Sequence, residues 1–366
     1  MLSRIEINRE HLIHNCTVLR SLLLPEQKLV AVLKANAYGH GMRQVVECIE
    51  PLVDGWQVDD AAETLELSKI SKKPIYVFGY VAKDELVDVV REGVTIVLYD
   101  TMRLAELHRL CAHVHIKIDA SLGRQGLLLE DIPDFLEELK KFPNIQVDGI
   151  YGHFANIEDV SDISHATKQL VAFEKAVLLF RAAGYTKIDR HMSATSGAMR
   201  LGFRAEHTIV RAGIGLYGLW PSKDLQKEGE ARGLFLKPVL RWVSCVAQVK
   251  IVPEGYSIGY GLTYVTPKKM KIAIIPQGYS DGFARDLSNM GTVLIRGHRC
   301  AVIGRVAMNM FAVDVDHLPD VEQEDEVVLL GKQGDECIST EEIAEGKTIN
   351  YEVTTRITPL LPRIVV

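Results

Sequence analysis

Hydrophobic runs of strand length alternate with amphipathic segments along the chain up to residue 220. In most of these segments the apolar residues recur at helical spacing, as Ile132, Phe135 and Leu139 do between residues 131 and 141. Strands that alternate with helices along a chain usually pair in parallel. The predicted strands are residues 28–33, 55–58, 74–80, 95–100, 113–119, 147–154, 187–193 and 208–214.

Eight strand–helix units in roughly 200 residues favour a closed (β/α)8 barrel, the TIM-barrel fold. An open, doubly wound sheet is the structural alternative. The segment 9–23 precedes the first of these strands and has the pattern of an additional leading helix. The other predicted helices are residues 42–53, 61–70, 83–91, 102–112, 131–141 and 163–183.

The pattern changes after residue 222. The segment 223–233 is polar and typical of a linker, and beyond it strands and turns follow one another, as in a small all-β domain. We therefore predict a barrel over residues 11–222 and a mainly β C-terminal domain over residues 223–366. The strand-like residues within 1–10 have no partner in the barrel, so we expect them to join the C-terminal domain.

The composition of the 366 residues, 47% hydrophobic and 25% charged, fits two folded domains. A net charge of −6, without a basic patch that contains aromatic residues, argues against a nucleic-acid partner. We find neither a signal-peptide pattern nor a run long enough to span a membrane, so we expect a cytoplasmic protein. The 6 cysteines form no CxxC pair, which predicts free thiols and no metal site.

Lys34 stands at the end of the first predicted barrel strand, after three apolar residues. Active sites of such barrels lie at the C-terminal ends of the strands. Partial burial there would favour the neutral amine that adds to a carbonyl group. By position alone, a lysine that extends from the barrel rim into solvent fits equally well.

The sequence KANAYGHG at residues 34–41 resembles the attachment motif for pyridoxal 5'-phosphate in the alanine racemase family. The resemblance extends from IEIN at residues 5–8 to YEV at 351–353 and LPR at 361–363, and it includes the barrel followed by a β domain. It implies that Lys34 holds pyridoxal phosphate as a Schiff base. The implied activity is that of an isomerase that interconverts L- and D-alanine.

The same resemblance implies the remaining contacts to the cofactor. Tyr38 would donate a hydrogen bond to the phosphate, together with Thr195 and the backbone N–H groups of Gly213 and Ile214. His153 would pack on the cofactor ring. The family has the sequence ANS where this chain has SAT at residues 193–195. Capping of a helix N-terminus is therefore an alternative role for Thr195.

Arg211 resembles the family arginine that faces the pyridine nitrogen of the cofactor. An arginine keeps its proton in a protein, so the ring nitrogen facing it should remain unprotonated. An unprotonated ring is a weaker electron sink, which limits side reactions such as transamination. Related barrel decarboxylases have a carboxylate at this position, and Arg211 argues against that activity. A salt bridge at the barrel rim is the structural alternative.

Racemisation requires a proton to leave one face of Cα and return to the other, which two bases accomplish most simply. The resemblance implies that Lys34 is one base and that Tyr260 is the other. In the family this tyrosine acts on the cofactor of the other subunit. The expected assembly is a head-to-tail homodimer with two shared sites.

Four further residues match family positions near the substrate. Arg124 would contact a cofactor oxygen and help to position the substrate carboxylate, and Met308 and Asn309 would lie near that carboxylate. Lys117 matches a lysine that is often carbamylated in the family, and the negative charge of a carbamate could orient Arg124.

Two departures from the family pattern concern the substrate. Asn309 stands where the family usually has aspartate, and Pro359 stands where it often has tyrosine. Both motivate a serine racemase, or a mixed alanine and serine racemase, as the alternative function. A non-catalytic carrier of pyridoxal phosphate is a second alternative, although such proteins are single-domain and lack the domain that bears Tyr260. The resemblance further implies a role in supplying D-alanine for a bacterial cell wall.

Overall fold

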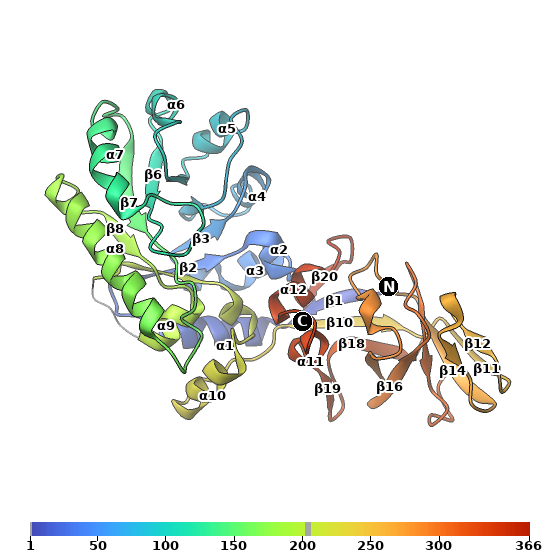
Figure 1. Cartoon of the computed structure of the whole chain (residues 1–366). Helices are drawn as coiled ribbons and strands as arrows, with labels where there is room; N and C mark the ends of the chain where they lie inside the picture. Colours follow the sequence, from blue (N-terminus) through green and yellow to red (C-terminus); the bar gives the residue numbers. More distant parts are fainter. Residues whose placement is uncertain (1, 202–205) are drawn as a thin grey trace. The chain divides into compact units, whose positions relative to one another are not determined.

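The structure of the chain is a computed structural model that describes residues 2–201 and 206–366 (Figure 1). It divides into two compact units. The barrel unit comprises residues 12–34 and 45–237, and the β unit comprises residues 1–11, 35–44 and 238–366. The ten residues that follow Lys34 therefore belong to the β unit, although they interrupt the barrel unit in sequence.

The barrel unit is built on an 8-stranded parallel sheet in the order β8-β7-β6-β5-β4-β3-β2-β9. Strands β8 and β9 approach each other, because Thr208 N donates to Arg190 O at 2.8 Å and Arg211 N donates to Ser193 O at 3.0 Å. The nearly closed barrel confirms the predicted fold class, and the open doubly wound sheet is wrong. The strands are β2 (Lys28–Val32), β3 (Gly55–Val58), β4 (Ile75–Val77), β5 (Thr95–Leu98), β6 (His113–Lys117), β7 (Gln146–Tyr151), β8 (Asp189–His191) and β9 (Ile209–Ala212).

Helices lie outside the strands of the barrel (Figure 1). Helix α7 buries Ile132, Phe135 and Leu139 on one face, as its sequence period predicts. Most helices are shorter than predicted, because their terminal residues belong to turns. The helices are α1 (Arg9–Arg20), α3 (Met42–Ile49), α4 (Ala61–Leu67), α5 (Leu86–Arg91), α6 (Leu104–Arg109), α7 (Ile132–Leu139), α8 (Ser164–Ala182) and α9 (Thr195–Leu201).

The polar segment 223–233 is not a linker, because it forms helix α10 (Lys223–Ala231). The Ser222 side chain caps this helix by accepting a hydrogen bond from Leu225 N at 3.1 Å. The helix buries only a narrow face at Leu225 and Gly229, and a Cβ at Gly229 would lie 2.4 Å from the Trp220 ring. So small an apolar face gives almost no periodic signal in the sequence.

The β unit is built on a 10-stranded sheet, mostly antiparallel, in the order β11-β14-β17-β16-β15-β18-β10-β1-β20, with β19 paired to β18. Its strands are β1 (Arg4–Ile7), β10 (Leu240–Cys245), β11 (Gln248–Val252), β14 (Met270–Ile275), β15 (Thr292–Ile295), β16 (His298–Ile303), β17 (Phe311–Asp314), β18 (Glu326–Gln333), β19 (Glu336–Ile338) and β20 (Arg363–Val365). The unit also contains the hairpin of β12 (Ser257–Ile258) and β13 (Tyr264–Val265) and the helices α11 (Thr340–Ala344) and α12 (Asn350–Thr355).

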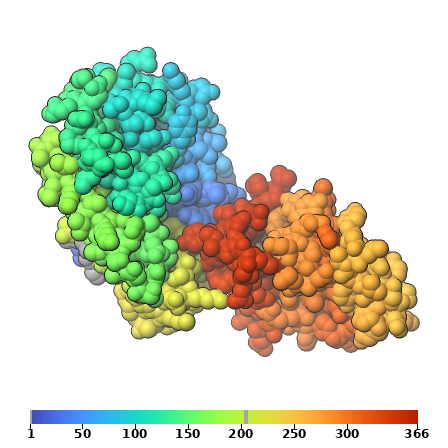
Figure 2. All heavy atoms as spheres, viewed as in Figure 1, coloured from blue at the N-terminus to red at the C-terminus, as the bar shows by residue number. Residues whose placement is uncertain are grey.

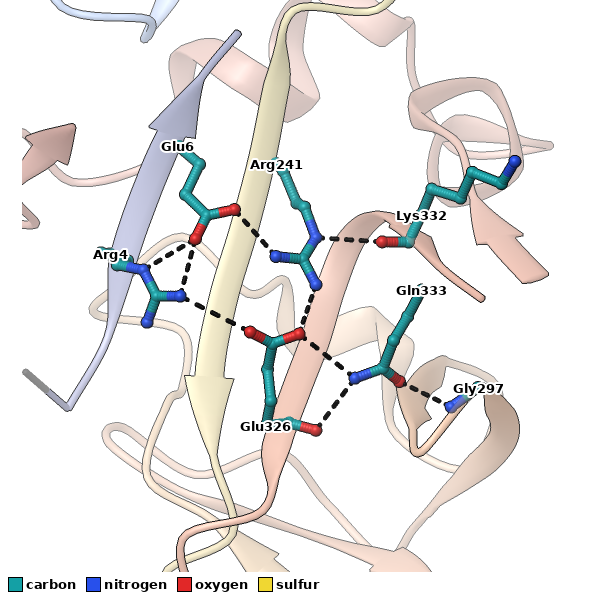
Figure 3. A network of polar contacts seen from close by, with 7 residues as sticks. All are labelled: Arg4, Glu6, Arg241, Gly297, Glu326, Lys332 and Gln333. Carbon is teal, nitrogen blue, oxygen red and sulfur yellow. Dashed lines mark hydrogen bonds and ion pairs between the residues drawn. The ribbon is translucent and has the colours of Figure 1, made fainter. Parts of the chain in front are cut away.

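Four charged side chains of alternating sign tie the N-terminal strand β1 into this sheet (Figure 3). Glu6 of β1 accepts hydrogen bonds from Arg4 and from Arg241 of β10, each at 2.8 Å, and Arg241 also pairs with Glu326 of β18. Burial by itself raises the pKa of Glu6, but the hydrogen bonds from Arg241 and Arg4 hold it below its usual range. The network thus links three adjacent strands.

In the described part of the chain, no helix has the length and apolarity needed to cross a membrane.

Candidate active site

Lys34 follows β2 and begins α2 (Lys34–Tyr38), whose residues 35–38 have left-handed φ values of 53–54°. Residues other than glycine disfavour this conformation by about 1–2 kcal/mol each, so four in succession need support from outside the turn. Asn36 supplies part of it, because its Oδ1 accepts from Met42 N at 2.9 Å. His40 Nδ1 lies 3.1 Å from Ala37 O and 3.0 Å from Tyr38 O.

The turn ends at Gly39, where glycine is required. Its φ is +83°, and a Cβ at this position would lie 2.0 Å from Thr354 O. Arg363 donates to Gly39 O through Nη2 at 3.0 Å, and the Tyr38 ring lies 6.2 Å from the Tyr351 ring. These contacts within the β unit hold a strained turn directly after Lys34, and such strain is characteristic of functional sites.

In the barrel unit, Lys34 Nζ lies 3.8 Å from Asp59 Oδ1. Asp59 follows β3, the neighbour of β2, so both side chains leave adjacent strands at their C-terminal ends. The Lys34 side chain is 40% exposed, which makes its surroundings less dry than its position after an apolar strand suggests. Asp59 is not among the residues predicted from the sequence, although its place directly after a strand is a usable signal.

Arg211 of β9 is 3% exposed and is surrounded by hydrogen-bond acceptors. Its Nη1 donates to His191 Nδ1, and its Nη2 donates to Gly152 O at 3.0 Å, to Met192 O at 3.2 Å and to His153 Nδ1 at 3.1 Å. In the described part of the chain, no carboxylate forms an ion pair with Arg211, so the rim salt bridge is not what the structure has. Burial lowers the pKa of Arg211 to about 10, which leaves it charged near neutral pH.

The arginine determines the protonation of two buried histidines. Because Arg211 only donates, His191 accepts at Nδ1 and must carry its single proton on Nε2. That Nε2 lies 2.9 Å from His115 Nδ1, so His115 is the next acceptor and carries its proton on its own Nε2. Burial lowers the pKa of His115 to about 3 and that of His191 well below its usual value, so both remain neutral. We call Arg211, His191 and His115 the relay.

The relay is packed by aromatic rings inside the barrel. The Tyr151 and His191 rings stack at 5.1 Å, and the Phe78 and Tyr151 rings stack at 4.3 Å. The relay crosses β7 where this strand has Gly149, and a Cβ there would lie 2.7 Å from the His115 ring. Neither histidine of the relay is among the residues predicted from the sequence, because a histidine on a buried strand is usually only part of the core.

Lys117, the last residue of β6, is 3% exposed, and its Nζ lies 4.6 Å above the Tyr151 ring. Burial lowers its pKa well below the usual value, and the charges of Arg211 and Arg124 lower it further. Among the residues described, no carboxylate forms an ion pair with it. Lys117 is therefore a buried amine whose uncharged form is favoured by its surroundings.

Thr195 begins α9 and is buried beside the short helical turn η3 (Ile214–Tyr217). Its Oγ1 accepts hydrogen bonds from Gly213 N and Gly215 N, each at 3.2 Å. A Cβ at Gly215 would lie 2.6 Å from Thr195 Cγ2, so glycine is needed for this close approach. The hydroxyl still has its own proton to donate. The arrangement is a cradle of small residues and donors after β8 and β9, which suits a phosphate group.

His153 and Arg124 complete the predicted residues of the barrel unit. His153 follows β7 and is half-buried; burial, reinforced by Arg211, holds its pKa well below the usual value. Arg124 is exposed on a loop after β6, where Asp119 accepts hydrogen bonds from Arg124 N at 3.0 Å and Leu122 N at 2.8 Å. The aspartate thus organises this loop.

The other predicted residues belong to the β unit. Tyr260 is 74% exposed and begins η4 (Tyr260–Leu262) at the tip of the β12–β13 hairpin. Met308 is 54% exposed. Asn309 Nδ2 donates to Ser280 Oγ at 2.9 Å, and Ser280 Oγ donates to Met308 O at 2.8 Å. Pro359 lies in a turn after α12.

Two family models match the chain. That of the alanine racemase N-terminal domain matches residues 7–221, and that of the alanine racemase C-terminal domain matches residues 239–365. An alanine racemase of Leptospira interrogans is 37% identical over an alignment that covers 100% of this chain and 96% of the relative. One of Carboxydothermus hydrogenoformans is also 37% identical, with 99% of this chain and 98% of the relative covered.

Solved structures are similar over the same range. An alanine racemase of Clostridium difficile has a TM-score of 0.92 at 32% identity and covers 100% of this chain and 96% of its own. One of Bartonella henselae, described with covalently bound pyridoxal phosphate, has a TM-score of 0.84 at 25% identity, and 100% of both chains is covered.

Proposed function

Because the chain belongs to the alanine racemase family, an isomerase family, we propose that it interconverts L- and D-alanine with pyridoxal 5'-phosphate bound at Lys34. One observation in the barrel unit carries this assignment. Three groups lie at or just after the C-terminal ends of strands in one parallel barrel. They are Lys34 after β2, Arg211 near the end of β9, and Thr195 after β8. These C-terminal strand ends are where barrel enzymes place their chemistry.

The residues present fit the cofactor. The Thr195 hydroxyl and the Ile214 N–H would hold the phosphate, with Tyr38 as a further donor, and Arg211 would face the pyridine nitrogen. The Gly213 N–H already donates to Thr195 Oγ1. When bound, the cofactor makes the Cα–H of the amino acid acidic enough to be removed. Arg211 would not protonate the ring nitrogen, because the acceptors His191 and His153 stabilise the charged form of its guanidinium. Lys34 Nζ would serve as one base, taking up or returning the proton on one face of Cα.

Tyr260 of a partner subunit would be the base on the other face, in a head-to-tail homodimer with two shared sites. Support comes from the surface of the β unit, where large side chains are exposed at Tyr260, Leu262, Val265, Met308 and Met310. These side chains belong to two segments that approach each other at Ile258 and Gly304, and exposed apolar side chains of this kind fit a surface that another chain covers. Arg124, Met308 and Asn309 would hold the substrate carboxylate. We expect the reaction to take place in the cytoplasm and to supply D-alanine.

Alanine is the favoured substrate over serine. The relatives are alanine racemases, and one of the two Nδ2 hydrogens of Asn309 already donates to Ser280 Oγ. In a chiral assay of the purified protein with pyridoxal phosphate, we expect kcat/KM for alanine to exceed that for serine by on the order of 100-fold. Comparable turnover of both amino acids would contradict this assignment, and failure to racemise either would contradict the activity itself.

We also propose that Lys117 is carbamylated. The neutral Nζ would attack the carbon of carbon dioxide, forming a C–N bond while one C=O pair moves to oxygen and one amine proton leaves to water. The resulting carbamate would place a negative charge near Arg211 and Arg124, the two cations whose charges reach Lys117. The depressed pKa supports this step, because only the uncharged amine reacts.

Intact-protein mass spectrometry under native conditions is expected to show one added carbon dioxide, which acid releases. Lys117→Ala should lower kcat by on the order of 10-fold, with partial recovery in millimolar acetate, because a free carboxylate can replace the missing charge. Lys141→Ala, at an exposed lysine, is the matched control and should change neither mass adduct nor rate. An unmodified mass at saturating bicarbonate would rule the carbamate out.

A further inference from the structure

The hairpin that carries Tyr260 has little support of its own. Strands β12 and β13 contribute two residue pairs, Ser257 with Val265 and Ile258 with Tyr264. Its tip contains three left-handed residues, Gly259, Gly261 and Leu262, with φ values of 72°, 71° and 51°. A short two-stranded ribbon is at most marginally stable by itself. The direction in which the Tyr260 side chain leaves the hairpin must therefore be determined by contacts with the rest of the β unit.

Asn289 supplies such a contact through both atoms of its amide. Its Nδ2 donates to Thr263 Oγ1 at 3.1 Å, and its Oδ1 accepts from Gly304 N at 2.6 Å. Asn289 has a φ of 58°, a conformation that asparagine adopts more readily than most residues. One side chain thus connects the tip of the hairpin to the turn that follows β16. The hairpin lies at the end of the β unit coloured gold in Figures 1 and 2.

The turn after β16 also touches the hairpin directly. Gly304 has a φ of +74°, and a Cβ there would lie 2.6 Å from Ile258 O. A Cβ at Gly261 would lie 3.1 Å from Arg305 Nε. The residue before Asn289 holds the same turn, because Ser288 Oγ accepts from Val306 N at 3.0 Å. This turn leads within a few residues to Met308 and Asn309.

We propose that Asn289 is a positioning residue for racemisation, because it fixes the Tyr260 tip against the segment 304–309. The proposal rests on the proposed role of Tyr260 as a base. In this proposal the exposed amide of Asn289 fixes the position of the Tyr260 phenol relative to the segment 304–309, which carries Met308 and Asn309. Asn289 itself would touch neither substrate nor cofactor.

Four variants of the full-length holoenzyme test the proposal. Asn289→Ala removes both hydrogen bonds and should lower kcat by on the order of 10- to 100-fold, since a displacement of about 1 Å can cost that much. Asn289→Asp keeps an acceptor for Gly304 N and can accept from the Thr263 hydroxyl, so it should restore most of the rate. Thr263→Val breaks only the contact to the hairpin and should be intermediate. Thr263→Ser, which keeps the hydroxyl, is its matched control.

Isotope effects separate positioning from general damage. The equilibrium constant of racemisation is 1, so kcat/KM must fall equally for both enantiomers of alanine. If Tyr260 is misplaced, its proton transfer becomes more rate-limiting. In Asn289→Ala the Cα-deuterium isotope effect should therefore rise for the enantiomer that Tyr260 deprotonates, and the solvent isotope effect should rise for the other. Asn289 and Thr263 are both exposed, so the thermal midpoint should stay close to that of the wild type.

Each contrary outcome has its own meaning. Wild-type rates in Asn289→Ala and Thr263→Val would overturn the positioning role. A lower rate of Asn289→Ala with unchanged isotope effects and a lowered thermal midpoint would show that Asn289 only stabilises the fold. That result would also overturn its positioning role. If Tyr260→Phe kept full activity, the proposed role of Tyr260 would fail first. That result is distinguishable, because it does not depend on any variant of Asn289.

Discussion

Replacing Lys34 by alanine is expected to lower kcat/KM for alanine by more than about 10⁴-fold, because one substitution removes both the covalent attachment point of the cofactor and one base. The absorbance of the attached cofactor should be lost at the same time. Added methylamine should restore part of the activity, because a small amine can enter the space left by the side chain. A chiral assay and an absorbance spectrum of the same preparation measure both effects.

Lys28→Ala is the matched control, because Lys28 is the first residue of the strand that Lys34 follows. Its Nζ pairs with Asp189 at 2.8 Å at the opposite end of the barrel strands, with nearly half of its side chain exposed. Loss of an exposed ion pair costs at most about 1 kcal/mol, so this variant should stay folded and active. A Lys34→Ala protein that retained racemisation without added amine would remove Lys34 from the mechanism.

Tyr260→Phe is expected to lower kcat by about 10³-fold while the bound cofactor keeps its absorbance. The substitution removes the only group on the phenol that can carry a proton and leaves the exposed ring in place. Tyr256→Phe, at an exposed tyrosine just before the same hairpin, is the matched control and should retain activity. Racemisation by Tyr260→Phe at the wild-type rate would leave the second face of Cα without an assigned base.

Mixing the two inactive variants tests whether the sites are shared. In a dimer of one Lys34→Ala chain and one Tyr260→Phe chain, one site would lack both groups and the other would have both. Random mixing makes half of the dimers mixed, and half of their sites are intact, so about one quarter of the wild-type activity should return. If Tyr260 acted within its own chain, mixing would restore nothing.

Most of the parallel strands were predictable, because strands such as β2 are buried on both faces and form continuous apolar runs that helices separate. Strand β8 is an exception, since its three residues are polar. The site residues could be predicted individually, from a strand end or from the family motif. Their connections could not. The relay depends on Gly149 leaving room for His115 to reach His191 across an intervening strand, and no spacing along the sequence encodes that.

The residues after Lys34 illustrate a second limit. The sequence KANAYGHG identifies an attachment lysine. Of residues 35–37 only Asn36 is of a type that adopts a left-handed conformation readily, and the two alanines disfavour it. That conformation is imposed by partners more than 300 residues away, at Thr354 and Arg363. The sequence therefore identifies the motif but not its backbone conformation, which tertiary contacts decide.

The relay has a consequence for how the enzyme should respond to acidity. Because the pKa of His115 is about 3 and that of Arg211 about 10, the relay carries one positive charge that does not titrate across the physiological pH range. The relay therefore keeps the same charge when the pH changes, and it neither takes up nor releases protons in this range. The electronic bias on a ring bound against it would be the same at every working pH. A change in turnover with pH would therefore not originate in Arg211 or His115.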